Sequence, residues 1–93
     1  MTSRDTICAS EGVGMRDFDS CRLTLADNLR ALRESANLTQ TLLSESSGVA
    51  RSQISAIERG LGNPSLSSLC SIANALGHDV CDLLEQSKIS IEE

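Results

Sequence analysis

A tight turn between two short amphipathic segments constrains the fold of this chain more than any other feature. Residues 39–60 read TQTLLSESSGVARSQISAIERG. We predict two helices here, over residues 40–47 and 51–59. Gly48 lies between them, where the backbone needs a positive φ that glycine adopts without strain. The two helices are therefore expected to form a compact, angled pair.

The second of these helices has an inward and an outward face. Ile54 and Ile57, three residues apart, mark the buried side. The outward side is small and polar, with two long cations: Arg51, Ser52, Gln53, Ser55, Ala56 and Arg59. A helix with such a surface fits the major groove of DNA, where arginine can pair with guanine and glutamine with adenine.

A longer series of motifs extends this pattern along the chain. Its members are Leu38-Thr39-Gln40, Gly48-Val49, Ile54-x-x-Ile57-Glu58-Arg59-Gly60, Asn63-Pro64-Ser65, Ala73-x-Ala75-Leu76-Gly77 and Asp82-Leu83-Leu84. On these motifs, residues 24–84 resemble the Cro/repressor-like helix-turn-helix domain, also called the XRE family. The resemblance implies an all-α fold, a compact five-helix lambda-repressor-like bundle whose helices 2 and 3 form the helix-turn-helix.

The chain divides into three parts on this reading. Residues 1–22 are polar and lack a sustained period, and we expect an irregular N-terminal arm. Residues 23–86 form the helix-turn-helix domain, and residues 87–93 form a C-terminal tail. The first helix should begin near Thr24 or Leu25, with residues 15–21 as an alternative extension, and end near Ala36. Asn37 is expected to cap its end, because asparagine tolerates the left-handed conformation.

Apolar spacing predicts the remaining helices and their buried sides. The first helix places Leu25, Leu29 and Leu32 on one face. Ser65 is expected to cap a fourth helix that ends at Gly77, and Asp79 to cap a fifth. The predicted buried residues of these two helices are Leu66, Leu69, Ile72, Ala73 and Leu76, followed by Val80, Leu83 and Leu84.

The resemblance also implies roles for individual residues. The expected base-reading residues are Arg51, Ser52, Gln53, Ser55 and Ala56. The expected phosphate contacts are Thr39, Gln40, Arg59, Gly62 and Asn63, and Thr39 should also cap its helix. The family pattern further pairs Arg33 with Glu58, which predicts an ion pair between the first and third helices.

Among the positions that depart from the family pattern, two affect the starts of helices. Ala50 stands where a serine cap is usual, which leaves the start of the third helix less well satisfied by about 1 kcal/mol. Leu42 stands where an acidic residue is common, so a capping carboxylate is missing and a leucine is expected to be partly exposed.

The charge distribution bears on which partner this surface can take. The formal net charge is -5, which disfavours a generic nucleic-acid binder because phosphate contacts need cations. The acidity is concentrated after residue 77, however, whereas acidic and basic residues balance over residues 24–77. An acidic far side is compatible with a DNA-facing side that carries the arginines.

Composition excludes several other classes of protein. No apolar run approaches the length of a membrane span, and no signal-peptide pattern opens the chain, so we expect a cytoplasmic protein without membrane contact. The four cysteines, Cys8, Cys21, Cys70 and Cys81, are expected to be free thiols. The spacing of Cys70, His78 and Cys81 matches no zinc pattern, and we expect neither a metal nor a cofactor. One histidine and no phosphate-binding loop also leave no catalytic constellation.

The leading hypothesis is a sequence-specific DNA-binding transcriptional regulator. It would act as a homodimeric repressor on double-stranded DNA with a palindromic operator. The alternative is an antitoxin-type module that neutralises a partner toxin and represses its own operon, with Leu42 and the acidic C-terminal segment as contact surfaces. An adaptor that never binds DNA fits the acidic charge but leaves Gln40 and Arg51 unexplained.

Overall fold

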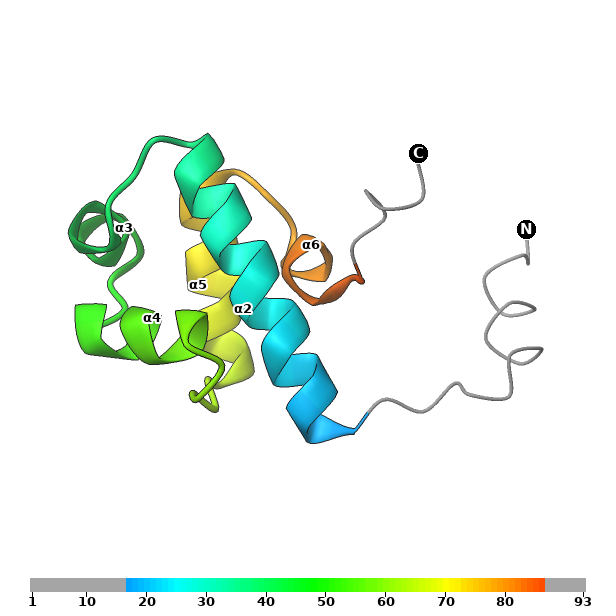
Figure 1. Cartoon of the computed structure of the whole chain (residues 1–93). Helices are drawn as coiled ribbons and strands as arrows, with labels where there is room; N and C mark the ends of the chain where they lie inside the picture. The colour runs from blue at the N-terminus through cyan, green and yellow to red at the C-terminus, as the bar shows by residue number, and fades with distance from the viewer. Residues whose placement is uncertain (1–16, 87–93) are drawn as a thin grey trace, which may run out of the picture.

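Five helices make up the secondary structure of residues 17–86, the part of the chain that this computed structural model describes, and no strand occurs among those residues (Figure 1). They are α2 (Phe18–Ser35), α3 (Gln40–Ser47), α4 (Arg51–Glu58), α5 (Leu66–Leu76) and α6 (Val80–Leu84). The predicted all-α, five-helix class is confirmed. The predicted tail and most of the predicted arm lie outside the described residues.

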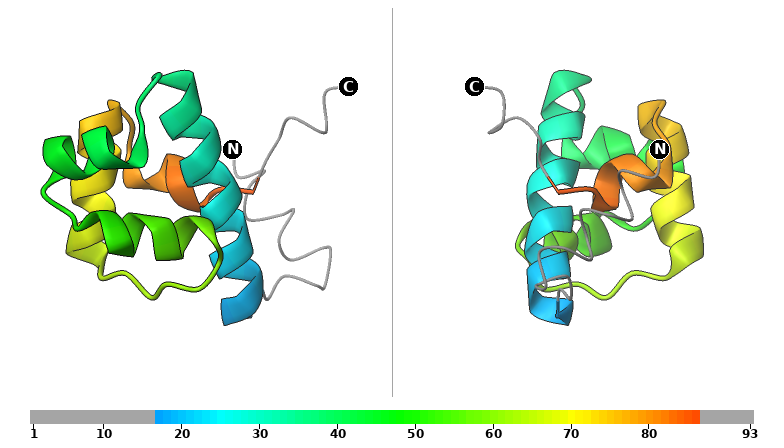
Figure 2. Two further views of the ribbon diagram at one scale, coloured as in Figure 1. Left: turned by 60° about the vertical axis from the view of Figure 1, so that its left-hand side comes forward. Right: turned by 90° about the vertical axis from the view of Figure 1, so that its right-hand side faces the viewer.

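Each of the five described helices packs against two others. Helix α2 packs against α4 on one side and α6 on the other, while α5 contacts both α3 and α6. Figure 1 shows α3 and α4 together at one side of α2 and α6 toward the other, and the left view of Figure 2 shows α6 between α2 and α5. The helix pair α3–α4 is therefore held from behind by α2 and α5 and leaves its own outer side open.

The core between these helices is aliphatic, as the composition requires. Its fully buried large side chains come from all five helices: Leu29, Leu43, Ile54, Ile57, Ile72 and Leu83. Complete burial of such a side chain contributes roughly 1.5–3 kcal/mol relative to exposure. Because every helix supplies at least one of them, the bundle holds its short helices, α3, α4 and α6, through packing more than through their own helix propensity.

Helix α2 begins at Phe18 instead of near Thr24 or Leu25, so it includes part of the alternative extension. Asp17 caps it by accepting a 2.8 Å hydrogen bond from the Ser20 N–H. Arg22 then pairs with Asp19 and places its guanidinium 5.0 Å from the centre of the Phe18 ring. These contacts, all one turn apart, stabilise a helical segment where the polar sequence shows no sustained apolar period.

The ends of the helices follow the predicted local chemistry. Asn37 has φ of 61° just after α2 and Gly77 has φ of 76° after α5, so both adopt the left-handed conformation. Thr39 accepts a 3.0 Å bond from the Leu42 N–H, and Ser65 accepts a 3.1 Å bond from the Ser68 N–H. The predicted caps of α3 and α5 are therefore confirmed.

Two of the predicted buried leucines are exposed. Leu66 retains 66% of its exposure, because it lies in the first turn of α5 at the edge of the stripe formed by Leu69, Ile72 and Ala73. Leu84 retains 37%, because it lies beside the buried Leu83 on the short helix α6 and faces away from it. Leu42 is 45% exposed, which confirms the prediction for that position.

Candidate nucleic-acid interface

The turn between α3 and α4 has the geometry that its sequence predicts. Gly48 has φ of 80°, and its N–H donates to the Ser44 carbonyl at 2.8 Å, which closes the last turn of α3. The Val49 N–H donates to the Ser47 hydroxyl at 3.1 Å, and the Val49 side chain is buried between the helices. The glycine therefore ends α3 and turns the chain, and the buried valine follows it before α4 begins.

On the outer face of α4, the exposure of the side chains is greatest at the N-terminal end. Ile54 and Ile57 are buried in the core, and Arg51 and Ser52 are exposed at the opposite side of the first turn. The other predicted base-reading residues, Gln53, Ser55 and Ala56, are half-buried. The side chains that reach furthest into solvent are thus at the N-terminal end of α4, which is the end that a recognition helix inserts into a major groove.

Ala50 leaves the start of α4 without a side-chain cap, as predicted. Its backbone is extended, with φ of -56° and ψ of 140°, and its methyl group can accept no hydrogen bond. The free N–H groups of this first helical turn, together with the helix dipole, make a locally electropositive end beside Arg51.

The predicted phosphate contacts lie at two separate places. Thr39 and Gln40 are at the start of α3, while Arg59, Gly62 and Asn63 are at and beyond the end of α4. Arg59 and Asn63 are exposed. Gly62 is held against α4, where an added Cβ would approach Ile57 Cγ1 to 3.0 Å. Glycine at this position therefore lets the 60–64 loop run close along the end of α4.

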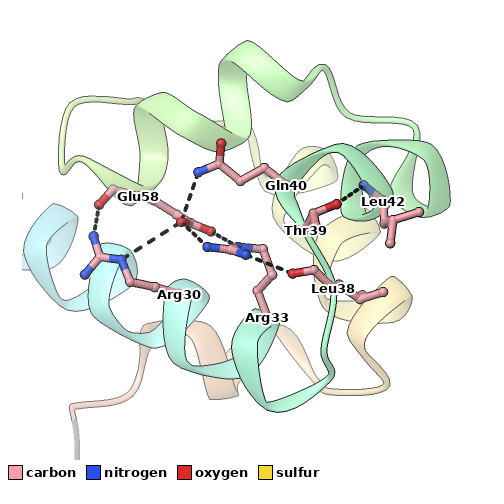
Figure 3. Close-up of polar contacts among 7 residues, drawn as sticks. All are labelled: Arg30, Arg33, Leu38, Thr39, Gln40, Leu42 and Glu58. Carbon is pink, nitrogen blue, oxygen red and sulfur yellow. Dashed lines mark hydrogen bonds and ion pairs between the residues drawn. The ribbon is translucent and has the colours of Figure 1, made fainter.

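One buried carboxylate joins three helices behind this surface (Figure 3). Glu58 is only 4% exposed, and its two oxygens accept bonds from Arg33 Nε at 2.6 Å and Arg33 Nη2 at 2.9 Å. Arg33 Nη1 also donates to the Leu38 carbonyl at 2.8 Å. The ion pair between Arg33 and Glu58 expected from the sequence is present in this bidentate form, which ties α2 to α4.

Gln40 also belongs to this network. Its Nε2 donates to Glu58 Oε1 at 3.1 Å, and the side chain is half-buried. In the structure its amide therefore points toward Glu58, which fixes the orientation of the first residue of α3. The motif alone gave no signal for this contact.

The Glu58 network shifts the pKa of both charged partners. Burial by itself raises the pKa of Glu58, but hydrogen bonds from Arg33 and Gln40 and the charges of Arg33 and Arg30 together lower it below the ordinary value. The hydrogen bond to Glu58 raises the pKa of Arg33. Both shifts favour the charged pair in the folded chain.

Sequence reasoning missed two further anchors, both from α2. Arg30 Nη2 donates to the Glu58 carbonyl at 2.6 Å, at the end of α4. Asn28 Nδ2 donates to the Leu83 carbonyl at 2.9 Å and to the Glu85 carbonyl at 2.7 Å, at the end of α6. The position of Arg30 three residues before Arg33 was the available signal, because that spacing places both side chains on one flank of a helix.

The three described cysteines and the histidine take no part in the Glu58 network. Cys70 and Cys81 are exposed, Cys21 is half-buried, and all three are free, whereas Cys8 lies outside the described residues. His78 Nδ1 lies 3.0 Å from Asp82 Oδ2. Over residues 17–86, no three histidine, cysteine, aspartate or glutamate side chains gather into a group that could hold a metal ion. Within the same residues, none of the helices has the length and apolar character needed to cross a bilayer.

The fold and the paired helices α3 and α4 define a helix-turn-helix protein, and comparison with known proteins specifies which kind. A helix-turn-helix family model, HTH_3, matches residues 29–83. The chain belongs to this XRE-type helix-turn-helix family, as the sequence motifs predicted.

Two relatives are similar in sequence to most of this chain. The control protein C.SmaI of Serratia marcescens is 37% identical over 83 residues, which cover 85% of this chain and 99% of that protein. The immunity repressor protein of Bacillus phage phi105 is 37% identical over 71 residues, which cover 76% of this chain. The chain spans only 49% of the length of that repressor.

Two solved structures share the fold. A hypothetical transcription factor, NHTF from Neisseria, superposes with a TM-score of 0.73 at 31% identity, covering 84% of this chain and 90% of that one. The restriction-modification controller protein C.AhdI from Aeromonas hydrophila gives a TM-score of 0.65 at 34% identity, covering 67% and 94%. The described helices thus correspond to a nearly complete structure in both neighbours.

Proposed function

We propose that this protein is a sequence-specific DNA-binding transcriptional regulator that acts as a homodimeric repressor. The observation that carries the proposal is the outer face of α4, where Arg51 and Ser52 are exposed at the N-terminal end while Ile54 and Ile57 anchor the opposite face in the core. The similarity to an immunity repressor and to control proteins supports the same function.

In this mechanism α4 enters the major groove and reads base edges. Arg51 pairs through its planar guanidinium with guanine, and Gln53, Ser52, Ser55 and Ala56 make shorter contacts. The start of α3, with Thr39 and Gln40, and the loop after α4, with Arg59, Gly62 and Asn63, contact backbone phosphates on either side. Because few long side chains read bases, DNA shape contributes to the choice of site.

The dimer supplies the second half of the reading surface. A two-fold dimer presents two α4 helices to half-sites about one helical turn apart, which makes the operator palindromic. The proposed dimer surface is α6 and the end of α5, where Leu84 leaves 37% of its surface exposed. Repression follows from occupation of the operator, and the protein acts in the cytoplasm, where its DNA is.

Selection of bound duplexes from a random pool at low salt tests this function, with the oligomeric state measured by sedimentation. The expected result is a palindromic motif that contains a guanine in each half-site, bound by a dimer. A folded protein that enriches no motif contradicts the proposal and favours the antitoxin-type alternative. Capture of a partner from its own cells would then be the next experiment.

A further inference from the structure

Two arginines, Arg30 and Arg33, lie near the Glu58 carboxylate, although one is enough to neutralise its charge. Arg33 already matches Glu58 through two hydrogen bonds, and its side chain is only 13% exposed. All three nitrogens of the Arg33 guanidinium are used, since Nη1 donates to the Leu38 carbonyl. The buried pair is therefore complete without any other cation.

Arg30 is the surplus cation, and it lies at the surface. Its side chain is 46% exposed, with Nε 4.0 Å from Glu58 Oε1. Nη2 donates to the Glu58 carbonyl at 2.6 Å, which holds the guanidinium against the C-terminal end of α4. Asp27 and Glu34 stand about one turn away on α2, yet neither forms a salt bridge with Arg30 among the described residues. The guanidinium is thus held in position by Nη2, its charge is only partly matched, and its Nη1 makes no hydrogen bond within the described residues.

Arg30 and Gln40 approach the same atom from two different helices. Gln40 Nε2 and Arg30 Nε both point toward Glu58 Oε1, the first from the start of α3 and the second from α2. Figure 3 shows the two side chains on either side of the Glu58 carboxylate. A phosphate that meets the start of α3 would therefore find a fixed guanidinium nearby, and arginine is suited to phosphate because its donors lie in one plane.

We infer that Arg30 is a further DNA-binding residue, which contacts a backbone phosphate beside the one met by the start of α3. This inference rests on the proposed DNA-binding function and adds a residue to it. Glu58 then has a second role, because the same carboxylate and its own carbonyl orient both Gln40 and Arg30. The ligand is a phosphodiester oxygen of the duplex backbone, so the contact strengthens binding without selecting a base sequence.

The salt dependence of binding distinguishes a phosphate contact from a purely structural role. Each phosphate that a cation neutralises contributes about 0.9 to the slope of log K against log salt on duplex DNA. We would measure affinity by fluorescence anisotropy at several salt concentrations, on the duplex selected by the wild-type protein and on a scrambled duplex. The variants are Arg30→Gln and Arg30→Lys, with Arg22→Gln as a matched control from the same helix, where Arg22 pairs with Asp19 instead.

The expected result is a slope that falls by about one for each bound copy of Arg30→Gln, with equal loss of affinity on both duplexes. Arg30→Lys should keep most of the slope, and Arg22→Gln should keep all of it. An unchanged slope in Arg30→Gln, with wild-type binding intact, overturns the inference and leaves Arg30 as a cap of α4. A wild-type protein that selects no duplex instead contradicts the proposed function itself.

A second measurement keeps the test decisive if Arg30→Gln unfolds. Duplexes that carry a single neutral methylphosphonate, placed in turn along each half-site, locate the phosphates on which the wild-type protein depends. The inference requires one such position whose neutralisation weakens binding by the wild type but not by Arg30→Met, which keeps the apolar stem and lacks the charge. If both proteins respond alike at every position, Arg30 contacts no phosphate.

Discussion

At the scale of single residues, Glu58 matters most, because it is the one charged side chain that the described core buries. A buried charge is costly unless it is paired, and here three side chains from α2 and α3 surround it. Removal of one partner from a buried pair leaves the other uncompensated, which costs roughly 3–5 kcal/mol. An exposed pair costs far less to break, usually under about 1 kcal/mol.

We therefore expect Glu58→Gln to lower the free energy of unfolding by about 3–5 kcal/mol, because Arg33 would remain buried without its counter-charge. Urea denaturation followed by circular dichroism measures this change. The matched control is Asp19→Asn, which breaks the exposed pair with Arg22 and should change stability by less than about 1 kcal/mol. Equal losses in the two variants would show that the Glu58 pair is no more important than a surface pair.

The lowered pKa of Glu58 also predicts how stability varies with pH. The folded chain keeps this carboxyl ionised to lower pH than the unfolded chain does, so between the two pKa values the unfolded chain binds more protons. The contribution is complete above the unfolded pKa and is lost as pH falls through the folded value. Urea midpoints taken from pH 6 downward should fall more steeply in the wild type than in Glu58→Gln. Parallel curves would exclude Glu58 as the source.

At the scale of elements, the helix pair α3–α4 depends on one backbone conformation. Gly48 has φ of 80° and no atom lies within 4 Å of where a Cβ would be. Gly48→Ala should therefore cost only the strain of the left-handed conformation, about 1–2 kcal/mol, without a steric term. Gly48→Asn should cost less, because asparagine tolerates this conformation better. Thermal melting of the three proteins checks this order, and an alanine variant as stable as the wild type would contradict it.

Substitutions at the starts of α3 and α4 are expected to have opposite effects on the free energy of unfolding. Thr39 caps α3, so Thr39→Ala should lower the free energy of unfolding by about 1 kcal/mol. Ala50 leaves α4 uncapped with a suitably extended backbone, so Ala50→Ser should raise it by a similar amount. Denaturation midpoints measure both changes. Loss of stability in Ala50→Ser would mean that the start of α4 is satisfied in some other way.

At the scale of the whole molecule, the bundle holds α4 with its N-terminal end exposed, and we propose that this end reads the operator. Arg51→Ala should weaken binding to the selected duplex by about 1–3 kcal/mol and relax the preference at one base position in each half-site. Arg59→Ala should weaken selected and scrambled duplexes about equally, since we assign Arg59 to phosphate. Competition binding with duplexes varied at single positions measures both effects. An Arg51→Ala protein that keeps the full base preference would refute Arg51 as a reader.

Much of this bundle could be read from local sequence because its signals are local. The turn at Gly48, the caps at Thr39 and Ser65 and the left-handed Asn37 each depend on one or two neighbouring residues. The paired isoleucines of α4 identify its buried face by spacing alone. The predicted base-reading and phosphate-contacting residues remain predictions, because their test requires DNA.

Other features depend on residues that are distant in sequence. The exposure of Leu66 is one example, because it depends on which other helices reach the start of α5. The early start of α2, in contrast, depends on contacts within that helix. The hydrogen bond from Arg30 to the Glu58 carbonyl joins α2 to α4. The hydrogen bond from Asn28 to the Leu83 carbonyl joins α2 to α6. Apart from the spacing of Arg30 and Arg33, nothing along the sequence signals these contacts, because they depend on which helices pack together.

The sequence by itself determined where this chain turns, which faces of its helices are apolar and which family it resembles, since these follow from backbone preferences and helical spacing. Only the tertiary structure decided what surrounds Glu58. The resemblance implied Arg33, whereas packing of α2 against α3 and α4 also brought Gln40 and Arg30 to the same carboxylate. The physical reason is that a buried charge draws its partners from whichever helices meet around it, and that meeting is a property of the folded chain.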